Sequence, residues 1–158
     1  MSTEKALRAQ LAEFLDWHHA HAGFDDAVAG LPATLRGTVP KGFAHSAWQI
    51  VEHMRIAQHD ILDFCLNKNY QEMKWPDDYW PTPVPKSAAA WTKSLAGFRA
   101  DRKALQQLAT NRRIDLFAKI PHGSGQTYLR ELLLVADHNA HHVAQIIDIR
   151  RALGAWKT

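Results

Sequence analysis

The clearest helical signal of the chain is TYLRELLLVADHNAHHVAQIIDIRRALG at residues 127–154. Thr127 is a good N-cap residue, and the run that follows it contains neither proline nor glycine. Gly154 stands where a residue of left-handed backbone conformation commonly ends a helix, and two consecutive arginines precede it, where positive charge suits the helix dipole. The stretch therefore predicts one long helix that ends at Leu153.

Another helical segment is expected at the start of the chain. It runs from about Thr3 towards Ala29, provided that Gly23 does not break it. Its side chains with helical spacing form one stripe: Leu7, Leu11, Phe14, His18, His21, Asp25 and Val28. The spacing predicts an amphipathic helix whose apolar side faces a core.

Two more segments have the same periodicity. One begins after Ser46, which forms a capping-box pattern with Gln49, and it fades at residues 67–69. The other begins after Ser87, a second N-cap residue, and ends near Thr110. No useful strand-like alternation occurs, so the pattern predicts an all-α fold.

A proline-rich stretch separates the second and third segments. It reads QEMKWPDDYWPTPVPK at residues 71–86, and it contains four prolines. Prolines forbid a continuous helix here. The large aromatic residues Trp75, Tyr79 and Trp80 favour an ordered crossover that packs on the core. The alternatives are that these residues cover the open end of the bundle or form a dimer surface. We expect a four-helix bundle with this long Pro/aromatic-rich crossover between helices 2 and 3, forming a single domain over residues 1–158.

Composition excludes several function classes. There are 19 lysines and arginines against 16 acidic residues, a net charge of +3, and no run of five like charges. This balance is too mild to indicate nucleic-acid or lipid binding. A single cysteine forms no disulfide within the chain, the polar start lacks the apolar core of a signal peptide, and no stretch approaches the ~18–20 apolar residues of a membrane span. We expect a cytoplasmic protein that binds neither nucleic acid nor membrane.

Three histidines lie within five positions of the long helix, in HNAHHVAQ at residues 138–145. Residues four apart on a helix differ by about 40° in direction and about 6 Å along the axis, so His138 and His142 can bind one ion. Both continue the apolar stripe of the helix, which turns their rings inward. This is the spacing that two imidazoles need to share a metal from one helix.

A third ligand must come from a facing helix, and His53 interrupts the inner stripe of the second segment. Three neutral histidines leave at least one coordination position open, which is typical of catalytic sites. Interior histidines are often merely hydrogen-bonded core residues, but three of them on inward stripes of two helices favour the metal site. His141 competes as a ligand because it lies three residues after His138, although it points away from the stripe.

Other polar side chains are candidates for supporting roles. His18 and His21, followed by Asp25, could line a pocket or hydrogen-bond to the ligands, although partly exposed polar side chains are the simpler interpretation. His45 is interpreted as peripheral. Cys65 has no activating partner and is interpreted as a buried structural thiol.

Several stretches of the chain resemble one known family. They are AHAGFDDAVAGLP at 20–32, AWQIVEHMRIAQHDILDF at 47–64, KWPDDYWP at 74–81 and IPHGSGQTYLRELLLVADHNAHHVAQIIDIRRALGAW at 120–156. In these respects the chain resembles the DinB-like superfamily, bundle proteins whose metal site uses one histidine from the second helix and a His-x-x-x-His pair on the last. The resemblance implies that His53, His138 and His142 are the metal ligands and that His141 is not. It also implies an activity like that of superfamily members that are metal-dependent thiol transferases or isomerases and use a low-molecular-weight thiol.

Two functions are expected. The first is a metal-dependent enzyme, a transferase or hydrolase, in which zinc or nickel on the three histidines activates a thiol or a water for attack on a small molecule. The second is a non-catalytic metal- or ligand-binding stress-response protein, because Glu52 and Asp137 flank the histidines in sequence and need not face the ion. A homodimer formed through exposed helix faces is a further expectation.

Overall fold

The chain forms five α-helices in the residues that the computed structural model describes, 3–16 and 20–156. They are α1 (Thr3–Phe14), α2 (Phe24–Val28), α3 (Ala47–Leu66), α4 (Ala88–Thr110) and α5 (Tyr128–Ala152), and one 3-10 turn, η1, covers Ala33–Leu35. The described residues contain no strand, only one isolated bridge, so the all-α prediction is confirmed for them. None of these helices combines the length and apolar character of a membrane span.

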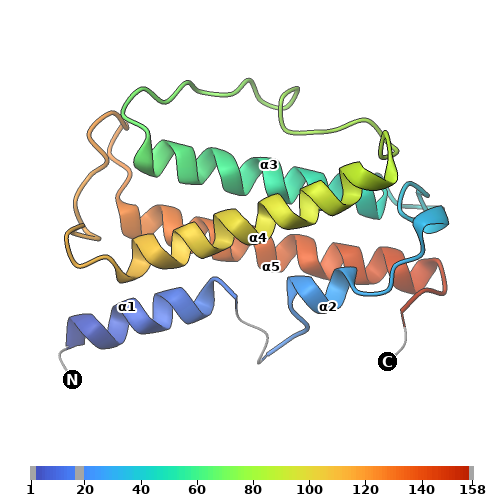
Figure 1. The fold of residues 1–158 in the computed structure, drawn as a ribbon, viewed down its shortest axis with the longest axis horizontal. Helices are drawn as coiled ribbons and strands as arrows, with labels where there is room; N and C mark the ends of the chain where they lie inside the picture. The colour runs from blue at the N-terminus through green and yellow to red at the C-terminus, as the bar shows by residue number, and fades with distance from the viewer. Residues whose placement is uncertain (1–2, 17–19, 157–158) are drawn as a thin grey trace.

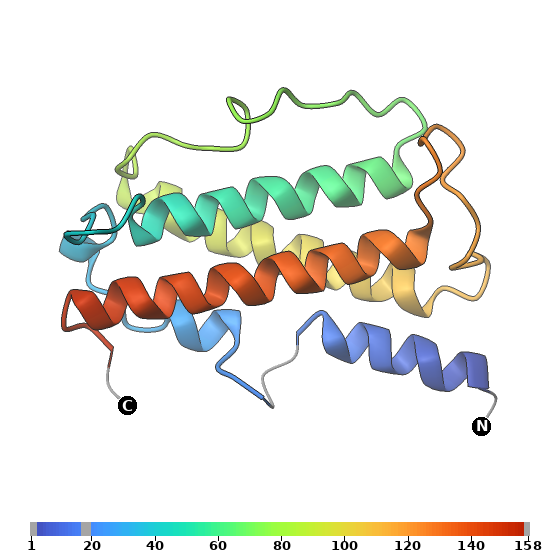
Figure 2. The ribbon, with the colours of Figure 1, turned by 180° about the vertical axis from the view of Figure 1, so that it is seen from behind.

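The segment from about Thr3 towards Ala29, predicted as one helix provided that Gly23 did not break it, forms two helices. The helix α1 ends at Phe14, and α2 begins after Gly23, whose backbone is extended and whose N–H donates to the Asp26 carboxylate at 3.0 Å. The helix α1 thus ends nine residues before Gly23, and Gly23 is the N-cap of α2. The two helices follow each other along one side of the molecule (Figures 1 and 2), with α1 against α4 and α2 against α5.

Two buried arginines hold these short helices in place. Arg8 donates to the main-chain oxygens of Ala109, at the end of α4, and of Ile114, beyond it, at 3.1 and 2.7 Å. Arg150 of α5 donates to the oxygen of Ala27 in α2 at 2.6 Å. Carbonyl groups at helix ends have no partner within their own helix, and guanidinium groups supply the missing donors.

The helices α3 and α5 lie side by side across the middle of the molecule, and this contact positions the site. Ser46 and Gln49 form the predicted capping box at the start of α3, with bonds of 3.1 and 3.2 Å. Thr127 caps α5 by accepting from the Arg130 N–H, and Gly154 has a left-handed φ of 66° just beyond the helix. The predicted ends of α5 are therefore confirmed within one residue.

The connection between α3 and α4, residues 67–87, runs back along α3 without regular helix (Figure 1). Near its end, the Ser46 hydroxyl donates to the Pro83 oxygen at 2.9 Å, and the Trp48 indole N–H donates to the Thr82 oxygen at 3.0 Å. These bonds keep the connection against α3, where it forms one wall of the site.

Candidate metal centre

The structure brings His53, His138 and His142 together, from α3 and α5. One nitrogen from each ring lies within 4.8 Å of the others, and the Nε2 atoms of His53 and His138 are 3.1 Å apart. His53 and His142 are buried, with 3% and 8% of their surfaces exposed, and His138 is half-buried. This group could hold a metal ion.

Helix geometry explains the convergence. His138 and His142 are one turn apart on α5, and their ring centroids lie 4.4 Å from each other. The α3 helix packs against α5, so that the His53 ring meets the edge of the His142 ring at 4.7 Å between centroids. The position of His53 on the inner stripe of α3 therefore brings its ring to the two histidines of α5.

Hydrogen bonds fix which nitrogen of two rings faces the centre. The Nδ1 atom of His53 lies 3.0 Å from the main-chain oxygen of Tyr79, and Nδ1 of His142 lies 2.7 Å from the side-chain oxygen of Gln145. Both partners are acceptors, so each Nδ1 carries the proton and each Nε2 keeps its lone pair. Metal-binding histidines commonly have such an acceptor on the second nitrogen.

The donor set fits a divalent ion. Two nitrogens bound to one tetrahedral ion at about 2.0–2.1 Å lie roughly 3.3 Å apart, close to the 3.1 Å between His53 and His138. Without an ion, two lone pairs at this distance would repel each other unless a proton lay between them. Neutral imidazoles suit zinc, nickel and other borderline ions.

Burial keeps the three rings neutral. It is the largest cause that lowers the pKa of His138 to about 4 and that of His142 to about 3, and the neighbouring imidazoles lower both further. Burial also lowers the pKa of His53, while its bond to the Tyr79 oxygen opposes the shift. Near neutral pH, all three nitrogens are therefore available as ligands without the loss of a proton.

Trp80, from the connection, lies flat on the His53 ring at 4.0 Å with an angle of 2° between the planes. Its opposite face stacks on His45, also at 4.0 Å. His45 is therefore not peripheral, which corrects the sequence-based interpretation. The contact of His45 with Trp80 depends on the path of residues 67–87, which the sequence does not reveal.

A pocket of about 380 Å³, called here the metal pocket, opens beside the three histidines. Its other walls include Asp60 of α3, Leu134 of α5, and Trp75 and Tyr79 of the connection. Trp75 is 66% exposed. The prediction that all three aromatic residues of the crossover pack in the core is therefore wrong for Trp75. Asp60 was not predicted, although its place seven residues after His53 puts it on the same side of α3.

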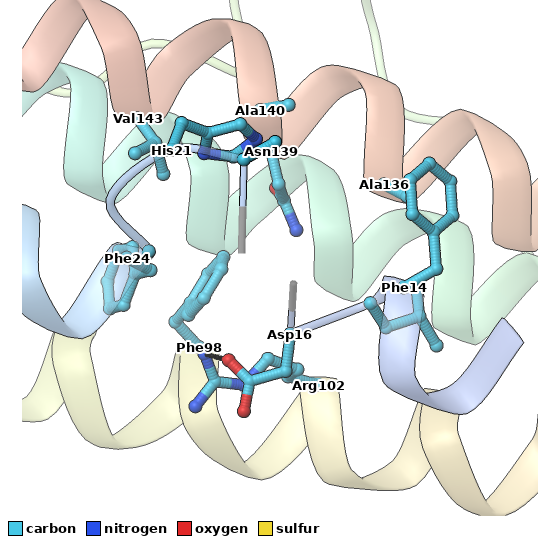
Figure 3. A pocket seen from close by; sticks show the side chains of 13 residues that line it. Phe14, Asp16, His21, Phe24, Phe98, Arg102, Ala136, Asn139, Ala140 and Val143 are labelled. Carbon is cyan, nitrogen blue, oxygen red and sulfur yellow. Dashed lines mark ion pairs between the residues drawn. The ribbon is translucent and has the colours of Figure 1, made fainter. Parts of the chain in front are cut away.

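His21 lies away from the three histidines. It lines a separate cavity of about 220 Å³ on another side of α5, where Asn139 and Phe98 point inward (Figure 3). Its Nδ1 atom contacts only the neighbouring main-chain oxygen of Ala22, at 2.9 Å, among the interactions of the described residues. His21 thus lines a pocket, but not the metal pocket, and His18 lies outside the described residues.

The remaining candidate residues do not belong to the group of three histidines. His141 is exposed and belongs to no potential metal group within the described part of the chain. Cys65 is buried, and burial, with a further contribution from the Glu131 carboxylate, raises the pKa of its thiol to about 12. Its interpretation as a buried structural thiol is confirmed. Glu52 is bonded to Arg55 at 2.7 Å rather than directed at the three histidines.

Comparison with known proteins gives one family. A family model described as the DinB superfamily matches residues 16–146, which include all three histidines of the site. No curated protein and no solved structure matches the chain.

Proposed function

The chain belongs to the DinB superfamily, and from this premise we propose that it is a metal-dependent enzyme. Its His53, His138 and His142 would hold a zinc or nickel ion and activate a thiol or a water for transfer or hydrolysis on a small molecule. One observation carries the proposal: three neutral imidazole nitrogens converge within 4.8 Å beside an open pocket.

The number of ligands supports catalysis over a structural role. Three protein ligands leave at least one position of the ion for a small molecule, whereas structural zinc sites are closed by four. When bound, a divalent ion supplies Lewis acidity, which lowers the pKa of a thiol or a water. The metal pocket of about 380 Å³ provides room beside that position.

The chain's own residues orient the ligands and cover one face of His53. The Tyr79 oxygen and the Gln145 side chain hold the protons on Nδ1 of His53 and His142. Trp80 covers one face of His53. These contacts keep the free nitrogens directed at one point, which reduces the reorganisation needed when an ion binds.

A second candidate is a non-catalytic metal- or ligand-binding protein of a stress response. It is favoured by the lack of a carboxylate among the described residues that hydrogen-bond to the three histidines. His53 bonds to the Tyr79 oxygen, His142 to the Gln145 side chain, and His53 and His138 to each other. A screen of thiol conjugation to model electrophiles discriminates the two. Metal-dependent turnover would exclude the binding protein, and its absence across the screen would favour it.

Metal analysis of purified protein tests the proposal directly. Wild-type protein should hold about one ion per chain, while His53→Ala and His142→Ala should lose it. His21→Ala is the matched control, since that histidine lies in the other cavity, and it should keep the ion. Stoichiometric metal in both ligand variants would end the proposal.

Two finer features belong to the same proposal. We propose that α1 and α2 together take the place of the first helix of a four-helix bundle, with residues 67–87 as its crossover. The single domain, a homodimer, the cytoplasmic location and the use of a low-molecular-weight thiol remain predictions.

A further inference from the structure

Asp60 is a carboxylate in the wall of the metal pocket that has only neutral partners. Its two oxygens accept hydrogen bonds from the hydroxyls of Tyr70, at 2.9 Å, and Tyr79, at 2.7 Å. Each oxygen is thus held in a fixed direction by one phenol. Hydrogen bonds from neutral donors orient a carboxylate but leave its negative charge uncompensated.

Two other carboxylates near the site are paired with cations. Glu52 is bonded to Arg55 at 2.7 Å and Glu131 to Arg130 at 2.6 Å. No lysine, arginine or histidine of residues 3–16 and 20–156 lies within ion-pair distance of Asp60. An unpaired charge in a partly buried place is unfavourable for the empty protein, which suggests that a ligand supplies the cation.

Asp60 is placed to bind the remote part of a substrate. Seven residues separate it from His53, about 10 Å along the axis of α3. A proton acceptor for a group on the ion would have to lie within hydrogen-bond reach of that group. A substrate that reaches both places would therefore present its reacting group to the histidines and its other end to Asp60.

The surroundings of Asp60 favour a cation. Trp75 and Tyr79 line the same pocket, with ring centroids 5.3 Å apart, and aromatic faces attract positive charge. The pKa values of the Tyr70 and Tyr79 hydroxyls are raised, first by burial and then by the neighbouring Asp60 carboxylate. The aromatic faces and the Asp60 carboxylate together make this place favourable for a positive charge.

There is also room beyond Asp60. A second pocket of about 460 Å³ shares Asp60, Tyr79 and Leu134 with the metal pocket, so the two adjoin. Its one arginine, Arg130, is engaged by Glu131. Substituents on a positively charged group could therefore extend past Asp60.

We infer that Asp60 determines specificity in the metal pocket, by binding an organic ammonium group of a substrate whose other end reaches the three histidines. The inference rests on the proposed function only for the reacting end of the substrate. The place that binds the ammonium group, called here the ammonium place, is formed by Asp60 and its neighbours without a metal ion. The substrate class is a small molecule with a metal-binding or reacting head and an ammonium group at its far end.

Calorimetry with two hydroxamates of equal length tests the inference on zinc-loaded protein. The probes are 6-aminohexanohydroxamic acid, which ends in an ammonium, and heptanohydroxamic acid, which ends in a methyl group. The ammonium probe should bind about tenfold more tightly, the size expected for a hydrogen-bonded charge pair. Equal affinities, or tighter binding of the methyl probe, would overturn the inference without any variant.

The variant Asp60→Asn should remove the preference and leave the affinity for the methyl probe unchanged. Asp63→Asn is the matched control, since Asp63 is on the same helix, bonds to Asn67 and lines neither pocket. A preference that persists in Asp60→Asn would also overturn the inference. Should this variant fold poorly, the probe comparison on wild-type protein still decides.

A second arm separates this inference from the proposed function. Chelator-treated protein is titrated with n-heptylammonium and with 1-heptanol, and the ammonium should again bind more tightly, by an amount that Asp60→Asn removes. If the protein bound no zinc but kept this preference, the proposed metal function would fail and the ammonium place would stand. If it bound zinc and showed no preference in either arm, only the ammonium place would fail.

Discussion

The metal pocket and the cavity around His21 adjoin the same helix but differ in chemistry. On α5, His138 and His142 face the first, while Asn139 and Val143, each one position further along, line the second. The three imidazoles of the metal pocket face one another, and two have acceptors on their second nitrogens. Within the described residues, the His21 ring bonds to the main-chain oxygen of its neighbour Ala22. The metal pocket is the candidate metal site because its imidazole nitrogens converge, whereas His21 stands alone in its cavity.

The largest effect should follow loss of a ligand. His142→Ala should lower zinc affinity by more than the ~100-fold that loss of an outer hydrogen-bond partner costs. A competition titration with a chromophoric chelator measures this. His21→Ala should leave the affinity unchanged. Similar losses in the two variants would show that the two sides of α5 do not differ as described.

Acid should have the next largest effect, through the depressed pKa values of the metal pocket. In the unfolded chain these histidines take up protons near the ordinary value of 6.5, whereas folded His138 does so only near 4. Below pH 6.5 the unfolded state therefore binds more protons, and the free energy of unfolding falls as the pH decreases towards 4. Urea unfolding of chelator-treated protein across this range measures the decrease. His138→Ala should flatten the slope, and an equal slope in both proteins would contradict the assignment.

Loss of an outer partner should come third. Gln145→Leu keeps the size of the side chain but removes the acceptor for Nδ1 of His142. Zinc affinity should fall about 10- to 100-fold, because the ring orientation is no longer fixed. The control is Gln107→Leu on the exposed side of α4, which should have no effect on the same titration. Unchanged affinity in Gln145→Leu would remove this residue from the site.

The other cavity should respond in stability rather than in metal binding. Asn139 donates to the Gln58 side chain at 2.9 Å, and Gln58 donates to the Phe98 oxygen at 2.7 Å, all in the core. Asn139→Ala leaves the Gln58 oxygen without its donor and should cost about 1–3 kcal/mol of unfolding free energy. Zinc affinity should change little. A large loss of zinc binding in folded Asn139→Ala would show that the cavity and the metal pocket are coupled.

The sequence predicted the parts of the site that depend on one helix. Helix geometry alone places His138 and His142 side by side, because they are four residues apart. The cap at Thr127 is likewise a local feature. His53 followed from the inner stripe of α3. Gln145, three residues after His142, could have been found by asking which acceptors lie one turn away.

The features that sequence analysis missed depend on tertiary contacts. His45 and Trp80 stack because residues 67–87 return along α3, and an irregular segment has no period from which to read its path. Asp60 lies two turns after His53, so adjacency in sequence to the three ligands does not indicate it. The division of the first helix was open, since a glycine inside an apolar stripe is compatible with either outcome.

The bonds between α3 and the connection of residues 67–87 bear on how small molecules reach the site. Along the helix, Ser46 holds Pro83, His53 holds Tyr79 and Asp60 holds Tyr70. Because it is bonded at intervals along its length, the segment acts as a wall of the metal pocket rather than as a lid, and we expect small molecules to enter through an opening that needs no movement of this segment. The width of that opening, rather than the rate of a loop movement, would then limit which molecules enter.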